Sequence, residues 1–201
     1  MEKPVIIFGA KGIAHPALEI FNSNNVVVYG VLEEDEKLHG TEINTVTVLG
    51  NTEDDGFLKL IGQKAEAFVA VDDTKYRKFL VEMLQERRKV QPVNAIHQTA
   101  YISTDAVIGH GNFINAKVNI GTAATIGSHC ILHSGAIIDH PVRMDSADMA
   151  SGNHSWVHRI YLHRNSVIKD IAFAFKIFPA CFHTVFDDSA MQLIHVFKTL
   201  L

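Results

Sequence analysis

The chain has 201 residues, of which 47% are hydrophobic and 20% are charged, and its formal net charge at pH 7 is −4. This length allows one or two domains with a sizeable core. A mildly acidic chain without a basic run argues against nucleic-acid binding through bulk electrostatics. No apolar run is long enough to span a membrane, and the first residues lack the pattern of a signal peptide. We therefore expect a cytoplasmic protein.

The N-terminal part of the chain alternates apolar strands with helices. Four strands are predicted, over residues 5–8, 26–32, 45–49 and 67–71. Three helices are predicted between and after them, over residues 16–21, 54–61 and 76–88. Alternation of this kind is typical of a parallel sheet. The domain boundary is predicted near residues 90–94, where Gln91 and Pro92 follow the last helix.

Two segments that follow these strands are candidate binding sites. Gly9-Ala10-Lys11-Gly12 follows the first strand, and backbone N–H groups at a helix N-terminus suit a pyrophosphate. Gly-x-x-Gly is not the full dinucleotide fingerprint, so a plain tight turn is the alternative. The acidic run at residues 33–36 follows the second strand, where a sugar hydroxyl or a base would bind. A solvated surface loop is the alternative there.

The second part of the chain repeats an apolar residue at every sixth position. The residues in this register are Ile96, Ile102, Ile108, Ile114, Ile120, Ile126, Leu132 and Ile138. Two positions earlier lies a mostly small residue, at Ala100, Ala106, Asn112, Val118, Ala124, Cys130 and Ala136. Period six matches neither a helix nor a lone strand. It predicts stacked triangular coils that point both sets of residues inward and polar side chains outward. Gly109, Gly121 and Gly127 are expected at corners that need backbone freedom. A β-sandwich is the alternative.

The repeat weakens after Ile138. The same register continues through Met144, Ala150, Trp156, Leu162 and Ile168, but the corner glycines are absent. His154, His158 and His163 gather there, and we interpret them as part of a decayed coil rather than as a metal site. Cys130 and Cys181 are expected to be free core thiols. The apolar stretches 172–178 and 191–201 are compatible with a helical cap over the open edge of the coils.

Several stretches together resemble a known family, the nucleotide-sugar acyltransferases of bacterial surface-glycan synthesis. This family includes sialic acid O-acetyltransferases and UDP-4-amino-sugar N-acetyltransferases. The stretches are Ile6-Ile7-Phe8-Gly9-Ala10-Lys11-Gly12, Tyr29-Gly30-Val31-Leu32-Glu33-Glu34-Asp35, Val48-Leu49-Gly50, Val69-Ala70-Val71-Asp72-Asp73 and His133-Ser134-Gly135-Ala136-Ile137-Ile138-Asp139-His140. The resemblance extends from about residue 4 to residue 140.

The resemblance implies an architecture and a set of partners. It implies a Rossmann-like nucleotide-sugar-binding domain over residues 1–93 and a left-handed parallel β-helix of hexapeptide repeats over residues 94–171. Residues 172–201 would form a C-terminal cap or tail. It further implies a homotrimer that binds coenzyme A and a sugar or nucleotide sugar, with acetyl-CoA as co-substrate and no metal. The segment at 166–171 resembles the one that closes such β-helices.

The resemblance also implies roles for individual residues. His140 would be the general base that takes a proton from the attacking amine or hydroxyl, a task that suits histidine near neutral pH. Asp139 would assist it. Gly9, Ala10, Lys11 and Gly12 would bind the phosphates, and Glu33 and Glu34 the nucleotide; Asp73 and His133 complete the expected substrate site. An exposed corner histidine is the alternative reading of His140.

The chain departs from the family at three positions that bear on catalysis. Pro141 follows the histidine where the family usually has an orienting acid, His133 replaces a usual asparagine, and Met149 replaces a common histidine. Asp139 or Asp145 is the candidate replacement for the acid. The leading hypothesis is an acyl-CoA-dependent sugar acyltransferase. The alternative is a catalytically impaired binding or scaffold protein that keeps the nucleotide-sugar pocket, and an oxidoreductase ranks third because a second Rossmann half is lacking.

Overall fold

The computed structural model describes residues 3–139, 142–146 and 149–150, all of which belong to one compact unit of the chain. The predicted cap over 172–201, the closing segment at 166–171 and the histidines at 154, 158 and 163 lie outside the described residues. None of the helices in the described part is long and apolar enough to cross a bilayer.

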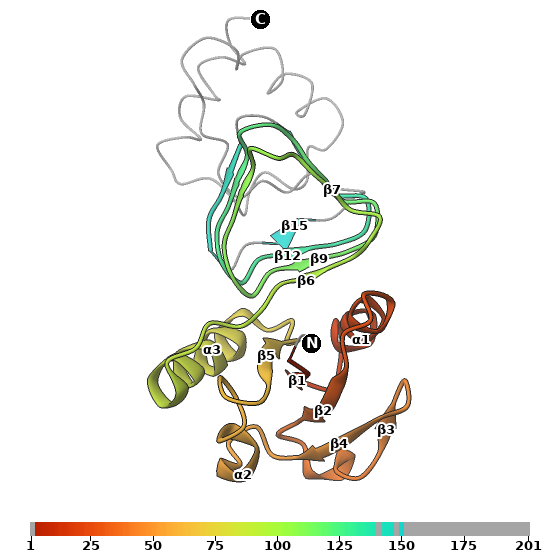
Figure 1. Cartoon of the computed structure of the whole chain (residues 1–201), viewed down its shortest axis with the longest axis vertical. Coiled ribbons are helices and arrows are strands. Elements are labelled where there is room, and N and C mark those ends of the chain that lie inside the picture. The colour runs from red at the N-terminus through yellow and green to blue at the C-terminus, as the bar shows by residue number, and fades with distance from the viewer. Residues whose placement is uncertain (1–2, 140–141, 147–148, 151–201) are drawn as a thin grey trace, which may run out of the picture. The chain divides into compact units, whose positions relative to one another are not determined.

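The N-terminal part is a five-stranded sheet in the order β3-β4-β2-β1-β5 (Figure 1). Four of its strands are parallel: β1 (Val5–Phe8), β2 (Val28–Leu32), β4 (Val46–Gly50) and β5 (Glu66–Val69). The edge strand β3 (Glu42–Ile43), which was not predicted, pairs antiparallel with β4. The parallel sheet expected from the alternating pattern is therefore present.

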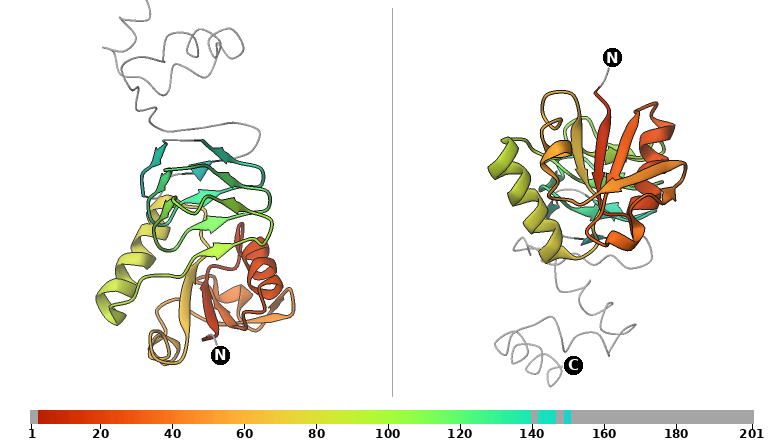
Figure 2. Two further views of the ribbon diagram at one scale, coloured as in Figure 1. Left: turned by 45° about the horizontal axis from the view of Figure 1, so that its top comes forward. Right: turned by 90° about the horizontal axis from the view of Figure 1, so that it is seen from below.

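Helices cover both faces of this sheet. They are α1 (Ala14–Ser23), the 3-10 helix η1 (Glu36–Leu38), α2 (Asp55–Leu58) and α3 (Thr74–Arg88). Because side chains alternate along a strand, Val5 and Ile7 of β1 join the core beneath α1, whereas Ile6 and Phe8 join the core beneath α2 and α3. Figure 2 shows α1 and α3 on opposite faces. Burial on both faces explains why β1 is apolar at every position.

The second part of the chain winds in triangular coils of three short strands each (Figure 1). Residues 18 positions apart stack in parallel register, as in the pairs Ile120↔Ile138 and Ile126↔Met144. One face contains β6 (Ala95–Ile96), β9 (Phe113–Ile114), β12 (Ile131–Leu132) and β15 (Met149–Ala150). The second contains β7 (Tyr101–Ile102), β10 (Asn119–Ile120) and β13 (Ile137–Ile138). The third contains β8 (Val107–Ile108), β11 (Thr125–Ile126) and β14 (Arg143–Met144). The predicted hexapeptide coil is confirmed.

The predicted inward residues form the core of the coils. Ile114, Ile120, Ile126, Leu132, Ile138 and Met144 are buried together with the small residues Val118, Ala124, Cys130 and Ala136. One inward slot is polar, at Asn112, and its side chain links successive coils. Asn112 Nδ2 donates to Gly127 O at 3.0 Å, and its Oδ1 accepts from Cys130 N at 2.8 Å. Asn94 makes the equivalent pair of bonds one coil earlier, to Gly109 O and Asn112 N. The buried amides are thus satisfied.

The prediction that the corner glycines provide backbone freedom is wrong for Gly109 and Gly127. The left-handed backbone conformation recurs at Gly111, Lys117, Ala123, His129 and Gly135, with φ between 57° and 72°. Gly109 and Gly127 instead allow the coils to approach closely. A Cβ on Gly109 would lie 2.6 Å from Gly127 O, and one on Gly127 would lie 2.6 Å from Ser146 N. At these two positions glycine provides space rather than a positive φ.

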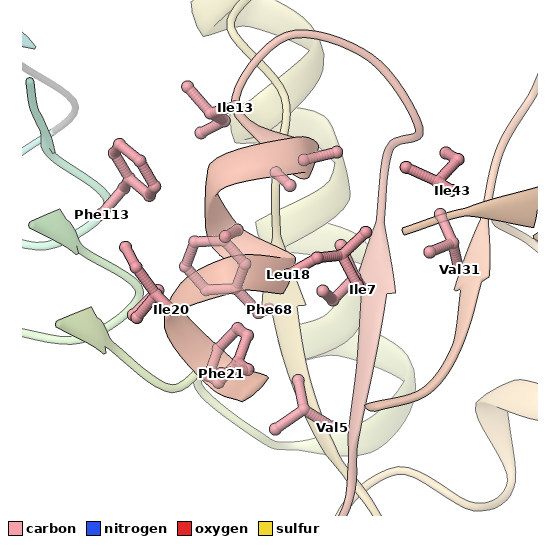
Figure 3. Packing of buried hydrophobic residues seen from close by; sticks show 14 of the residues in the cluster. Val5, Ile7, Ile13, Leu18, Ile20, Phe21, Val31, Ile43, Phe68 and Phe113 are labelled. Carbon is pink, nitrogen blue, oxygen red and sulfur yellow. The ribbon is translucent and has the colours of Figure 1, made fainter. Parts of the chain in front are cut away.

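The prediction of a polar outer surface fails on one face of the coils. The outward residues Ala95, Phe113 and Ile131 of β6, β9 and β12 are buried in the same cluster as the residues of α1 (Figure 3). Asn24 at the end of α1 also donates through Nδ2 to Ile96 O at 2.8 Å. On the other two faces Tyr101, Val107 and Ile137 remain exposed. The α1 side of the sheet and this face of the coils therefore share one hydrophobic cluster.

Candidate functional site

The candidate binding residues of the N-terminal part gather at one edge of the sheet. The carboxyl ends of parallel strands meet at the same edge, and there the glycine turn follows β1, the acidic run follows β2 and residues 70–73 follow β5. Strand β1 lies between β2 and β5, and α1 and α3 lie on opposite faces. Such a switch in strand order is where open α/β sheets bind ligands.

Both glycines of the turn are required by the local geometry. Gly9 has a φ of +102°, and a Cβ on it would lie 2.7 Å from Ala70 O. Gly12 has a φ of +55°, and a Cβ there would overlap the carboxylate of Asp72. The turn thus lies directly against the segment that follows β5. Helix α1 begins immediately afterwards, with no side-chain cap from Ile13 and no acidic residue in its first turn.

The carboxylate of Glu33 binds the glycine turn that precedes this helix. Its Oε2 accepts from Ala10 N at 2.7 Å and its Oε1 from Asp35 N at 3.2 Å. The backbone of Glu33 is held as well, because its N–H donates to Gly50 O and its carbonyl accepts from His39 Nε2. Glu33 therefore fixes the glycine turn to the loop after β2.

Lys11 lies at the outside of the same turn. Its Nζ is 3.1 Å from Asp35 Oδ2, and this hydrogen bond raises the pKa of Lys11 and lowers the pKa of Asp35. The pair is exposed, and exposed ion pairs contribute little to stability. Lys11 can therefore give up its bond to Asp35 for a bond to a ligand anion without a large loss of folding free energy.

A second cluster lies beside Glu34, and sequence reasoning did not find it. Tyr76 Oη is 3.2 Å from Oγ1 of the buried Thr52, and the Tyr76 ring stacks on Phe79 with centroids 6.0 Å apart. Burial raises the pKa of Tyr76, and the nearby carboxylate of Glu34 adds to this shift. Thr52 follows β4 and Tyr76 is in the first turn of α3, so only the strand order brings them to Glu34.

The other predicted substrate residue of this edge, Asp73, has a structural partner. Its Oδ1 accepts from Tyr76 N at 2.7 Å, and Asp73 is the N-cap of α3. Aspartate is a favoured cap because its oxygen satisfies a free N–H of the first turn. The position of Asp73 places the first turn of α3, including Tyr76, at the carboxyl edge.

The predicted residues of the coils lie at corners. His133 follows β12 and its ring contacts that of Phe113 edge-on, with centroids 6.4 Å apart. Asp139 follows β13 at the next corner, is exposed, and its carbonyl accepts from Val142 N at 3.2 Å. His140 and Pro141 lie outside the described residues, and so does the side chain of Met149. Among the residues that the structure describes, no group of three or more His, Cys, Asp and Glu is arranged to hold a metal ion.

Comparison with known proteins places these features in context. No family model matches the chain. A curated UDP-3-O-acylglucosamine N-acyltransferase of Parasynechococcus marenigrum is 34% identical over 77 residues, which is 38% of this chain and 22% of that protein. The chain therefore spans about a fifth of the length of this curated relative.

Two solved structures resemble most of the chain. One is a histidine-to-alanine mutant of GDP-perosamine N-acetyltransferase from Caulobacter crescentus, in complex with CoA and GDP-perosamine. It has a TM-score of 0.65 and 28% identity, over 73% of this chain and 67% of that one. The other is the acetyltransferase domain of PglB from Neisseria gonorrhoeae, with a TM-score of 0.63 and 22% identity over 72% and 69%. The second likeness concerns the fold alone.

These findings confirm the resemblance predicted from the sequence. The coils with their attached parallel sheet have the architecture of hexapeptide-repeat acetyltransferases. In sequence and in structure, the chain is similar to the hexapeptide-repeat sugar acyltransferases.

Proposed function

We propose that the protein is an acyl-CoA-dependent acyltransferase that transfers an acetyl group to the amino or hydroxyl group of a nucleotide sugar. The observation that carries this proposal is the likeness, at 28% identity over 73% of the chain, to an N-acetyltransferase in complex with CoA and GDP-perosamine. In this proposal residues 1–93 form a Rossmann-like nucleotide-sugar domain and residues 94–171 a left-handed β-helix, followed by a cap or tail over 172–201. The protein acts in the cytoplasm, in bacterial surface-glycan synthesis.

The nucleotide sugar binds at the carboxyl edge of the sheet. The N–H groups of Lys11, Gly12 and Ile13 directly precede α1 and, together with Lys11 Nζ, attract the phosphates. Ala10 N–H already bonds Glu33, so Glu33 acts by shaping the turn. Glu34 is exposed beside Tyr76, and its carboxylate accepts hydrogen bonds from the hydroxyls of the ribose or the N–H groups of the base. This arrangement assigns different tasks to the two acidic residues.

The acetyl transfer takes place at the coil corner after β13. His140 takes a proton from the acceptor amine or hydroxyl as that group attacks the thioester carbonyl. A C–N or C–O bond forms, the C–S bond breaks, and the proton passes from the imidazolium to the departing sulfur. Asp139 stabilises the imidazolium, and His133 contacts the acceptor. The reaction as proposed needs no metal, since the thioester is already activated.

We further propose that the protein is a homotrimer. Tyr101 and Ile137 are exposed at outward positions of the face formed by β7, β10 and β13, and Val107 at the equivalent position of the next face. Exposed apolar side chains on the outer faces of the coils favour burial against another subunit.

The proposed base is tested by comparing the native protein with His140→Ala. We expect loss of turnover by about 100-fold or more, because general-base catalysis contributes on that order. His97→Ala is the matched control, since His97 lies at a corner of the first coil and its ring bonds the neighbouring Thr99. Native-level turnover by His140→Ala would contradict the assignment of the base. Nucleotide-sugar binding without turnover by the native protein would favour the scaffold alternative.

A further inference from the structure

Arg77 is a charged residue in the interior of the described structure. It lies in the first two turns of α3 and is only 2% exposed. Arginine is almost never so deeply buried unless its charge and donors are engaged. Its Nη1 donates to two successive backbone carbonyls, those of Val71 at 2.8 Å and Asp72 at 3.0 Å. Burial lowers the pKa of Arg77, which shows how strongly this guanidinium is desolvated.

The segment that Arg77 holds is the one against which the glycine turn lies. A Cβ on Gly9 would lie 2.8 Å from Val71 Cγ2, and one on Gly12 would overlap the Asp72 carboxylate. The turn has no room to shift toward this segment, so the position of the Val71–Asp72 backbone sets the position of the turn. Through two hydrogen bonds Arg77 therefore fixes one wall of the proposed nucleotide-sugar site.

Arg77 also lies within electrostatic range of a coil corner. Its charge, after burial, contributes to lowering the pKa of His129 to about 4, and it interacts electrostatically with Cys130. His129 has a φ of 61° and its ring lies directly over Gly111, which leaves no space for a Cβ there. The corner is thus packed tightly.

Helix α3 contains a second arginine with similar bonds but a different location. Arg88 Nη2 donates to Ile61 O at 3.0 Å and to Lys59 O at 3.1 Å. These carbonyls follow α2, away from the glycine turn and from the coil corner. Comparing variants at Arg77 and Arg88 therefore distinguishes a general loss of α3 stability from a specific effect on the proposed site.

We propose that Arg77 is a positioning residue, which holds the acceptor-binding turn in place through the Val71–Asp72 backbone. This inference rests on the proposed function. A nucleotide sugar bound at the sheet edge must present its amine or hydroxyl to the coil with sub-ångström accuracy, because small misplacements cost large factors in rate. Arg77 holds the Val71–Asp72 wall against which the turn of that site lies.

The test compares Arg77→Met, Arg77→Lys and the matched control Arg88→Met. For Arg77→Met we expect the KM for the nucleotide sugar to rise and kcat to fall, each by about tenfold. The KM for acetyl-CoA should stay within about twofold of the native value. Arg77→Lys keeps the charge and should recover part of the loss, whereas Arg88→Met should lower the melting temperature alone. Equal kinetic effects of Arg77→Met and Arg88→Met would overturn the proposal.

A second readout does not depend on turnover. Hydrogen exchange of the full-length protein should be about tenfold faster at residues 9–13 and 71–73 in Arg77→Met, and unchanged there in Arg88→Met. Arg88→Met should instead speed exchange near residues 59–65. If the native protein showed no acetyl transfer, the proposed function would fail while this exchange pattern still decided the role of Arg77. If Arg77→Met does not fold, Arg77→Lys gives the same comparison with a smaller expected change. Unaltered exchange at the turn in both Arg77 variants would contradict the inference.

Discussion

At the scale of single residues, His129 shows how packing sets protonation. It lies half-buried at a coil corner, and burial, Arg77 and His110 together lower its pKa from 6.5 to about 4. The folded chain therefore holds this side chain neutral. Above pH 6.5 His129 is neutral in both the folded and the unfolded chain. As the pH falls toward 4, the unfolded chain binds a proton that the folded chain does not, and the free energy of unfolding decreases.

We predict that His129→Asn reduces the pH dependence of stability between pH 6.5 and pH 4. Asparagine tolerates the positive φ of 61° at this position, so the backbone should be retained. The native protein should lose about 2 kcal/mol more over this interval than the variant does. Urea unfolding at several pH values measures the difference. His15→Asn is the control, because His15 is exposed on α1 and is not among the groups that lower the pKa of His129. Parallel pH profiles for the native protein and His129→Asn would contradict the prediction.

From the sequence, site residues could be predicted where they directly follow a strand, but not where the order of strands brings them together. Glu33 was identified because it follows a strand, and the structure places its carboxylate on the glycine turn. Thr52, Tyr76 and Arg77 were not identified, since each becomes relevant only through the order of strands in the sheet. Asp73 was assigned to substrate, and the structure shows that it also caps α3. Residue type and position along the chain carry no information about such partners.

At the scale of elements, the three faces of the coil have different surroundings. The hexapeptide period predicts the inward residues well, because every face repeats the same alternation. No comparable rule predicts whether an outward residue is buried or exposed. Phe113 on β9 is buried beside α1, whereas Val107 on β8 is 62% exposed, although both occupy the same position of the hexad. Only the docking of the sheet distinguishes the two faces, and the repeat could not predict which face would be covered.

This difference gives a stability prediction. Phe113→Ala should lower the free energy of unfolding by about 3–5 kcal/mol, because it leaves a cavity between β9 and α1. Val107→Ala should change it by less than about 0.5 kcal/mol in the isolated chain, as for most surface positions. Urea titration followed by circular dichroism measures both. Similar losses for the two variants would show that the face formed by β6, β9 and β12 does not support the sheet as described.

At the scale of the whole molecule, the parallel sheet and the coils share one hydrophobic cluster. The fold was predictable from two periods in the sequence, the strand–helix alternation and the six-residue repeat. The candidate site was predictable only in part. The edge of the sheet follows from the glycine turn, whereas the roles of His140 and Asp139 depend on resemblance to other proteins. Pro141 and His133 are two of the positions where this chain departs from the family's usual residues, and substitutions there bear most directly on its chemistry.

The activity that we propose for this chain is transfer of an acetyl group from acetyl-CoA to a nucleotide sugar. The most direct measurement is release of free coenzyme A thiol by the native protein with acetyl-CoA and a panel of GDP- and UDP-amino sugars, with mass spectrometry of the sugar product. We predict that thiol is released only when an acceptor is present, and that the amount released equals the amount of acetylated sugar formed. Thiol release that does not depend on any acceptor, or binding of both substrates without an acetylated product, would contradict it.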